Sequence, residues 1–177
     1  MKKLITLILI AGMAVMHFSC TQNNSKTPDL SEQIKELETT LYSEDSDFNP
    51  DDAAKLMVLY ARYADSLPDD NISAEYLFKA ADISMYRSDA MNTLSLLDLF
   101  LQRYPTHERA AMSLFLKAFV FDTQLGDTAS ARQYYEEFIS LYPNEEFVED
   151  AKMAIKNLGK SPEELINEFE KLNAGLE

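Results

Sequence analysis

Apolar residues recur along most of this chain at intervals of three and four, the period of a helix with one buried face. Ile34, Leu37 and Leu41 begin the pattern. Short turns containing Pro, Gly or Asp separate further segments of the same kind at about residues 50–66, 73–87, 90–104, 108–124, 128–142, 145–158 and 162–172. Since no alternating, strand-like segment lies between them, the pattern predicts an all-α chain of about eight helices.

The segment from Met112 to Pro143 indicates how these helices pack. Its first half, up to Leu125, is apolar nearly all the way round, whereas its second half has one apolar face and ends at Tyr142 and Pro143. A helix that is apolar on every side must be covered by other elements on more than one side. We therefore expect this segment to form the centre of a stack of helical hairpins.

An internal repeat supports the stack. Pro68, Pro105 and Pro143 are spaced 37 and 38 residues apart, within the range typical of repeat arrays. A shift of 38 residues places small residues on small and large on large: Leu77 on Phe115, Ala80 on Ala118, Thr93 on Ala131, Leu97 on Tyr135 and Phe100 on Phe138. We expect two clear hairpins, 73–105 and 108–143, and a third, 145–172, that closes the end of the array.

One family shares this pattern. The residues Gly126, Asp127, Ala131, Tyr135, Phe138, Tyr142 and Pro143 resemble the second half of a tetratricopeptide repeat. The resemblance implies a short right-handed α-solenoid spanning residues 30–177. Phe119 and Asp122 depart from the family, which usually has a small residue and an aromatic there. The period also exceeds the family's 34 or so residues, and we assign the excess to one additional turn in the first helix.

The N-terminus resembles the signal of a bacterial lipoprotein. Lys2 and Lys3 precede 13 apolar residues, too few to span a membrane, and Ser19 precedes Cys20, the only cysteine. The resemblance implies a signal peptide over residues 1–19, lipidation of Cys20 and a flexible tether over residues 20–29. Thr21, in place of an Asp, implies the outer membrane, with the protein anchored by lipid and facing the periplasm. A plain secretory signal with a chance cysteine is the alternative.

Charge and composition exclude several functions. The formal net charge of −14 repels phosphate backbones, so we expect no nucleic-acid partner. His107 is the one histidine beyond the signal peptide, and no Gly-rich phosphate loop is present. We therefore expect no metal site, no cofactor and no enzyme activity. A cell-wall glycan hydrolase that uses acidic residues is the less favoured alternative.

The signal and the repeats together resemble helical-repeat lipoproteins of the outer membrane, such as that of the barrel-assembly machinery. The resemblance implies a scaffold for protein–protein interaction in envelope biogenesis or maintenance, which binds an envelope protein or peptide in a groove lined by the first helices. Transferring the register of the repeat gives these groove residues: Glu75, Phe78, Asp82, Ser113, Leu116, Val120 and Thr123. A self-associating structural envelope protein, with end helices that stack on copies of themselves, is the main alternative.

Overall fold

A computed structural model of the protein describes residues 29–43 and 49–174. The predicted signal peptide, Cys20 and residues 21–28 of the tether lie outside the described residues. Within the described ranges the only regular elements are helices, which confirms the all-α prediction. They are α1 (Leu30–Leu41), α2 (Pro50–Ser66), α3 (Ser73–Tyr86), α4 (Ala90–Arg103), α5 (Ala110–Thr123), α6 (Thr128–Leu141), α7 (Val148–Asn157) and α8 (Pro162–Ala174).

Polar residues mark where several of these helices begin. The Asn49 side chain accepts hydrogen bonds from the first turn of α2, and Pro50 occupies the first helical position. Asp89 and Asp127 cap α4 and α6 in the same way. At α8, the Glu164 carboxylate accepts from the Ser161 backbone N–H at 2.8 Å, and the Ser161 hydroxyl accepts from the Glu164 N–H at 3.2 Å. This reciprocal pair confirms the predicted capping box.

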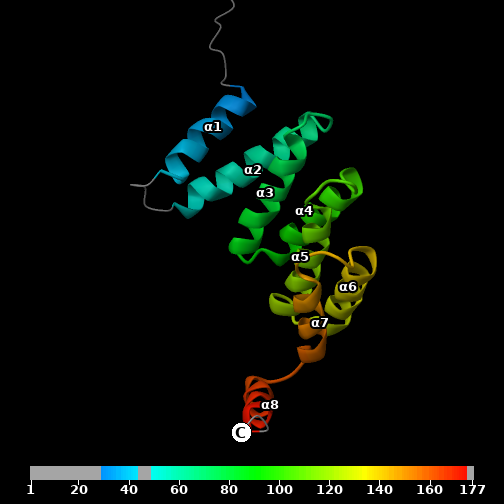
Figure 1. The fold of residues 1–177 in the computed structure, drawn as a ribbon. Helices are drawn as coiled ribbons and strands as arrows, with labels where there is room; N and C mark the ends of the chain where they lie inside the picture. Colours follow the sequence, from blue (N-terminus) through cyan, green and yellow to red (C-terminus); the bar gives the residue numbers. More distant parts are fainter. Residues whose placement is uncertain (1–28, 44–48, 175–177) are drawn as a thin grey trace, which may run out of the picture.

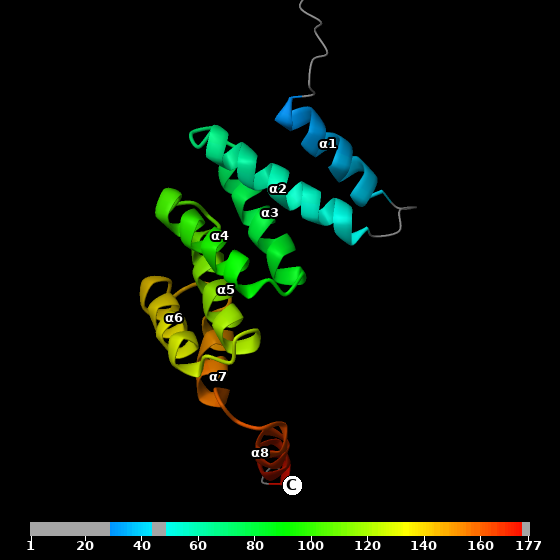
Figure 2. The same ribbon diagram turned by 180° about the vertical axis from the view of Figure 1, so that it is seen from behind.

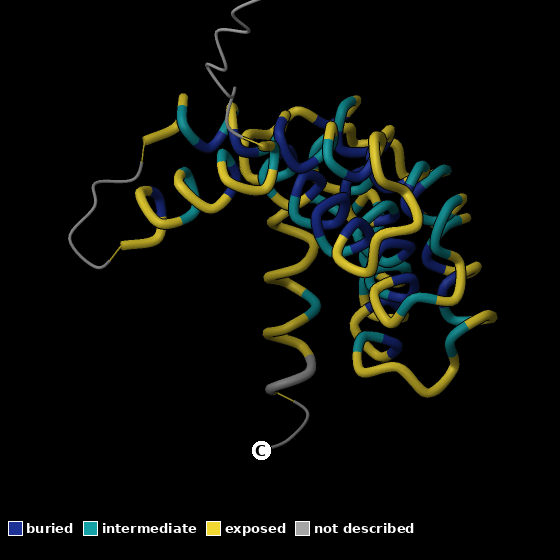
Figure 3. Tube along the Cα trace, turned by 90° about the horizontal axis from the view of Figure 1, so that it is seen from above, coloured by how far each residue is buried: buried dark blue, intermediate teal, exposed yellow. Residues whose placement is uncertain are grey.

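The helices stack in chain order as antiparallel neighbours. Figures 1 and 2 place α3, α5 and α7 on one side of the array and α4 and α6 on the other. Each of α2 to α6 packs on the helix before it and the helix after it. Seen from above in Figure 3, the array bends into an arc. This is the architecture of a short α-solenoid, in which each hairpin buries its apolar face against its neighbours.

Small side chains allow α5 and α6 to cross closely. Ala118 and Ala131 are fully buried at the crossing, and the buried rings of Tyr135 and Phe138 fill the space beside them. In the preceding hairpin, Thr93, Leu97 and Phe100 are buried at the corresponding positions of α4. The alternation of small and large residues predicted for the second helices is therefore the packing pattern of the fold.

The long period does not come from an additional turn in the first helix, as the sequence suggested. Helices α3, α4, α5 and α6 all have 14 residues. The length lies instead in the segments between hairpins, 104–109 and 142–147, which form hydrogen-bonded turns. These turns satisfy backbone groups that a continuing helix would otherwise satisfy, so the hairpins keep standard helices at a longer spacing.

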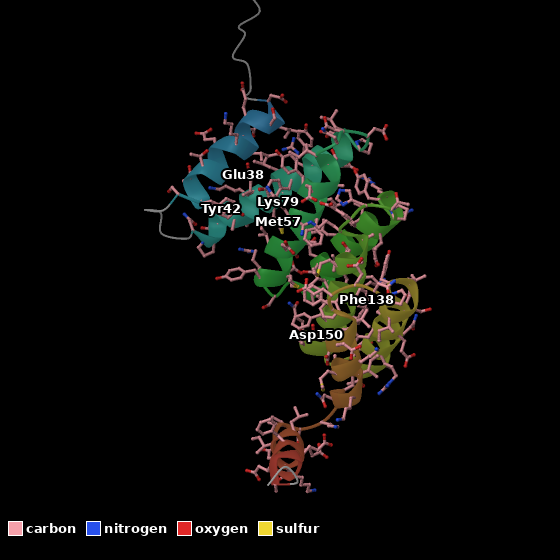
Figure 4. The ribbon with its side chains drawn as sticks, in the orientation of Figure 1. Glu38, Tyr42, Met57, Lys79, Phe138 and Asp150 are labelled. Carbon is pink, nitrogen blue, oxygen red and sulfur yellow. The ribbon has the colours of Figure 1, made fainter. Side chains whose placement is uncertain are left out.

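A polar contact fastens α1 to the rest of the array. The Glu38 carboxylate accepts a hydrogen bond from the Tyr60 hydroxyl at 2.6 Å and pairs with the Lys79 ammonium at 2.9 Å. In Figure 4, the labels of Glu38 and Lys79 lie side by side where α1 meets α2 and α3. Desolvation raises the pKa of Glu38, but the hydrogen bonds and the positive charge of Lys79 outweigh it, and the pKa falls below its usual range.

The last helix does not close the array as predicted. Helix α8 stands apart from α7 and the rest of the molecule (Figures 1 and 3), and it forms no more than marginal contacts with any described helix. The chain turns away after Asn157 instead of folding back, for a reason given below. None of the described helices combines the length and the apolar character needed to cross a membrane.

Candidate partner-binding surface

The helix period places one row of side chains on the outward face of each first helix. Positions i, i+4 and i+7 of α3 are Glu75, Lys79 and Asp82, and the same positions of α5 are Met112, Leu116 and Phe119. Thr123 continues the second row by one more turn. We call these seven residues the first-helix face.

Part of the face is an electrostatic cluster beneath which an aromatic ring is buried. Arg109, just before α5, pairs with the Glu75 carboxylate at 3.4 Å. The Arg109 guanidinium also lies 5.0 Å from the centre of the Phe78 ring, which is only 6% exposed and packs edge-on against Phe100. Phe78, predicted to line the groove, therefore supports the surface from below and offers little area to a partner.

His107 extends the same cluster. Its Nε2 lies 3.9 Å from the Glu75 carboxylate, and its Nδ1 accepts a hydrogen bond from the Arg109 backbone N–H at 3.2 Å. Glu75 thus faces two potential cations that both come from the segment between α4 and α5. This arrangement ties the two hairpins together on the first-helix face and leaves Glu75 already occupied within the protein.

Asp82 is different, because among the described residues it forms no ion pair. Its side chain is exposed, yet desolvation by the surrounding protein raises the pKa of its carboxyl to about 6. Arg109 lowers this pKa and Glu75 raises it, both by smaller amounts. A carboxylate that meets water but has protein on several sides lies on a concave surface. The first-helix face is therefore hollowed around Asp82.

Two residues predicted to line the groove lie in the interior. Ser113 and Val120 are fully buried, and Val120 packs among Ala90, Leu94 and Phe121. Neither side chain can contact a partner without movement of the helices. Leu116 is half-buried against the core, and Thr123 is exposed, with its hydroxyl donating to the Phe119 carbonyl at 2.8 Å.

The error is one residue of register. Helix α3 begins at Ser73 and α5 at Ala110, 37 residues later, whereas α4 and α6 begin 38 residues apart, at Ala90 and Thr128. A shift of 38 was read from the second helices and applied to the first. One residue turns a helical position by about 100°, enough to move a side chain from the surface into the core.

The correct register brings in surface residues that the sequence analysis missed. With a shift of 37, Glu75 corresponds to Met112 and Asp82 to Phe119, and both pairs match in exposure. Phe119 is 37% exposed, so the large residue at a usually small position of the family forms part of the surface. The signal available was the turn between helices, which is Arg87–Asp89 in one hairpin and Gln124–Asp127, one residue longer, in the other.

The hollows with a definite lining lie away from this face. One of about 550 Å³ lies across α4, α5 and α6, where the Lys117 ammonium pairs with Asp98 and lies 3.9 Å from the centre of the Tyr134 ring. Another, of about 560 Å³, lies at the turns around Pro68 and Tyr104. Both are shallow and open. Among the described residues, no group of three His, Cys, Asp or Glu side chains converges as a metal site would.

Comparison with known proteins agrees with the fold. A family model described as a tetratricopeptide repeat matches residues 112–145, the hairpin of α5 and α6 with the turn that follows. No curated protein matches the chain. With the helical array, the match makes this a tetratricopeptide-type helical repeat protein, an architecture that supports protein–protein interaction in general.

Proposed function

We propose that this chain is a lipoprotein of the bacterial outer membrane, anchored by lipid at Cys20 and facing the periplasm, and that it binds another envelope protein along the first-helix face. Its role would be that of a scaffold in envelope biogenesis or maintenance. Residues 1–19 would be removed as a signal peptide, residues 20–29 would serve as a tether, and residues 30–177 would form the binding domain. The sequence of the first twenty residues supports the anchor.

The observation that carries the binding proposal is the state of Asp82. The protein bears the cost of desolvating this carboxylate without supplying an ion-pair partner among the described residues. Uncompensated, perturbed groups are concentrated at functional sites because a ligand can compensate them. The exposed ring of Phe119 lies at the corresponding position of the next hairpin. Together they suit a partner segment that combines a basic side chain with an apolar one.

A labelling experiment tests the anchor. We expect cells grown with a radiolabelled fatty acid to incorporate the label into the full chain and to retain the protein in the outer-membrane fraction. The variant Cys20→Ser should lose both the label and the membrane association. An unlabelled wild-type protein that fractionates as freely soluble would refute the anchor and leave the binding proposal standing.

A capture experiment tests the binding face. The double variant Asp82→Asn/Phe119→Ala changes two exposed residues of the first-helix face and avoids the buried Phe78. The matched control Glu137→Gln/Leu141→Ala makes the same kinds of change at exposed positions of α6, on the other side of the array (Figure 1). We expect cross-linking in solubilised envelopes to recover fewer partners with the first variant only. Equal recovery with both variants would reject this face.

A further inference from the structure

The apolar face of α8 is the largest unexplained feature of the molecule. Leu165, Ile166 and Phe169 lie on one side of the helix and are 37%, 58% and 66% exposed. Within the described part of the chain, no helix packs on them. An isolated helix of this length is marginally stable in water, and most helices in proteins gain their stability by packing an apolar face. Helix α8 therefore needs a surface to cover it.

The turn between α7 and α8 explains why that surface is not its own neighbour. Leu158 has φ −51° and ψ 125°, Gly159 has φ +76°, and the Lys160 N–H donates to the Asn157 carbonyl at 3.1 Å. These values define a type II turn. The residues that end α3 and α5, Arg87 and Gln124, remain helical and let the chain fold back. The extended Leu158 instead sends α8 outward.

Additional bonds hold α8 in this outward position. The Lys160 ammonium contacts both carboxylate oxygens of Glu168, at 2.8 and 2.7 Å, across two turns of the helix. The reciprocal capping box of Ser161 and Glu164 fixes the first turn. The turn, the ion pair and the cap make α8 a preformed helix presented away from the body, which is the form that an exchanged element takes.

The array also leaves one position vacant. Helix α4 packs on α3 and α6 packs on α5, but no second helix packs on the outer side of α7. The face of α7 that corresponds to the covered face of α5 carries Lys152, Met153 and Lys156, and Met153 is 56% exposed. This is the place that the second helix of a third hairpin would take.

The charges of the two surfaces are complementary. The helix period places glutamates along both borders of the apolar stripe of α8: Glu164 and Glu168 on one side, Glu163 and Glu170 on the other. Two such stripes would repel one another, so α8 does not suit a second α8. The exposed face of α7 supplies lysines beside an apolar side chain, which is the complementary arrangement.

We propose that two copies of this chain exchange α8, so that α8 of each copy packs on α7 of the other as the second helix of its last hairpin. The exchange would be reciprocal about a two-fold axis, and each contact would be made twice. It would bury Leu165, Ile166 and Phe169 of both copies and place their flanking glutamates beside Lys152 and Lys156. The face used is distinct from the first-helix face, so a dimer could still bind two partner segments.

Sedimentation of the full chain tests the exchange. We expect a concentration-dependent dimer that becomes monomeric in the variant Phe169→Glu. The control Leu141→Glu makes the same kind of change at an exposed apolar residue of α6 and should leave the dimer intact. Because α8 does not support the rest of the fold, the Phe169→Glu chain should keep its helical content. A wild-type chain that stays monomeric at all concentrations, or a dimer unaffected by Phe169→Glu, would overturn the proposal.

Charge exchange tests the assigned surface. The variant Lys152→Glu/Lys156→Glu should weaken dimerisation at least tenfold, and Glu163→Lys/Glu170→Lys should weaken it by a similar factor. Mixed together, the two variants cannot restore both reciprocal contacts, but the chain that carries all four changes should dimerise again. Failure of this quadruple variant to recover, with its fold intact, would reject α7 as the surface that receives α8.

Disulfide trapping distinguishes exchange from closure within one chain. In the full chain with Cys20→Ser, we introduce Met153→Cys and Phe169→Cys and then oxidise it. Exchange predicts a product of twice the chain's mass, and mixing the two single-cysteine chains should give the same linkage between different copies. A disulfide found only within one chain would show that α8 closes on its own α7 and would overturn the proposal.

Discussion

At the scale of single residues, the same charge can have opposite meanings on this protein. Glu75 and Glu38 have cations beside them, and their contacts join one helix to another. Asp82 is nearly as close to Arg109 in the fold but has no such contact, and its pKa rises to about 6. The difference marks Asp82 as a residue kept at some cost to stability, which is common where a ligand later supplies the missing interaction.

The pH dependence of stability tests this interpretation. A carboxyl whose pKa is higher in the folded state stabilises the fold at low pH, and this contribution is lost as the pH rises through the folded-state value of about 6. We therefore expect Asp82→Asn to raise the melting temperature at about pH 7.5 and to change it much less at about pH 4.

Thermal unfolding followed by circular dichroism at both pH values provides the measurement. Glu137→Gln, at an exposed position of α6, controls for the loss of one negative charge from an acidic protein. If Asp82→Asn lowers the melting temperature at about pH 7.5, the carboxylate contributes to stability in the free protein, and its assignment to a binding face loses its basis.

At the scale of elements, the hairpin of α5 and α6 shows how small residues set the distance between helices. Ala118 and Ala131 have no exposed surface, so their methyl groups define the closest approach of the pair. In the hairpin of α3 and α4 the contact is polar, since the buried Thr93 hydroxyl lies 3.0 Å from the Ser84 hydroxyl. The two hairpins thus reach the same geometry with different chemistry, and a family model matches the apolar one.

Enlarging the crossing residue should therefore separate the helices. We expect Ala131→Leu to destabilise the protein by about 1–3 kcal/mol, because a close-packed crossing has no room for three more carbon atoms. Ala129→Leu makes the same substitution at an exposed position of the same helix and should change stability by less than about 0.5 kcal/mol. Urea denaturation of both variants measures the difference, and equal effects would contradict the close packing assigned to Ala131.

At the scale of the whole molecule, the array is close to one-dimensional, because each helix touches mainly its neighbours in sequence. Stability should then be greatest in the middle, where α3, α4 and α5 are covered on two sides. It should fall toward the ends, where α1 is held by α2 and by the Glu38 contact and α8 has no substantial contact among the described helices.

Hydrogen exchange should follow this order. We expect amide protons of α3 to α5 to exchange most slowly and those of α8 to exchange fastest in dilute protein. At concentrations where two copies associate, the proposed exchange of α8 should slow the amides of α8 and of the outer face of α7 together. Protection of α8 that equals that of α4 in a dilute monomer would contradict the isolated position of this helix.

Sequence alone determined the helical fold and the second-helix packing. The three-to-four-residue period defined the helices, the caps at Asn49 and Ser161 marked two beginnings, and the spacing of small and large residues located the crossing of α5 and α6. These features are local, because a helix forms from hydrogen bonds and side-chain positions within a few residues of one another.

Only the tertiary structure decided which residues face outward and how the array ends. The register of the first helices depended on one residue in the turn after α5, and that residue moved Ser113 and Val120 into the core and Met112 and Phe119 to the surface. The direction of α8 depended on the backbone angles of Leu158. A helical pattern states which side of a helix is apolar but not what covers it, because that depends on the rotation and placement of neighbouring helices.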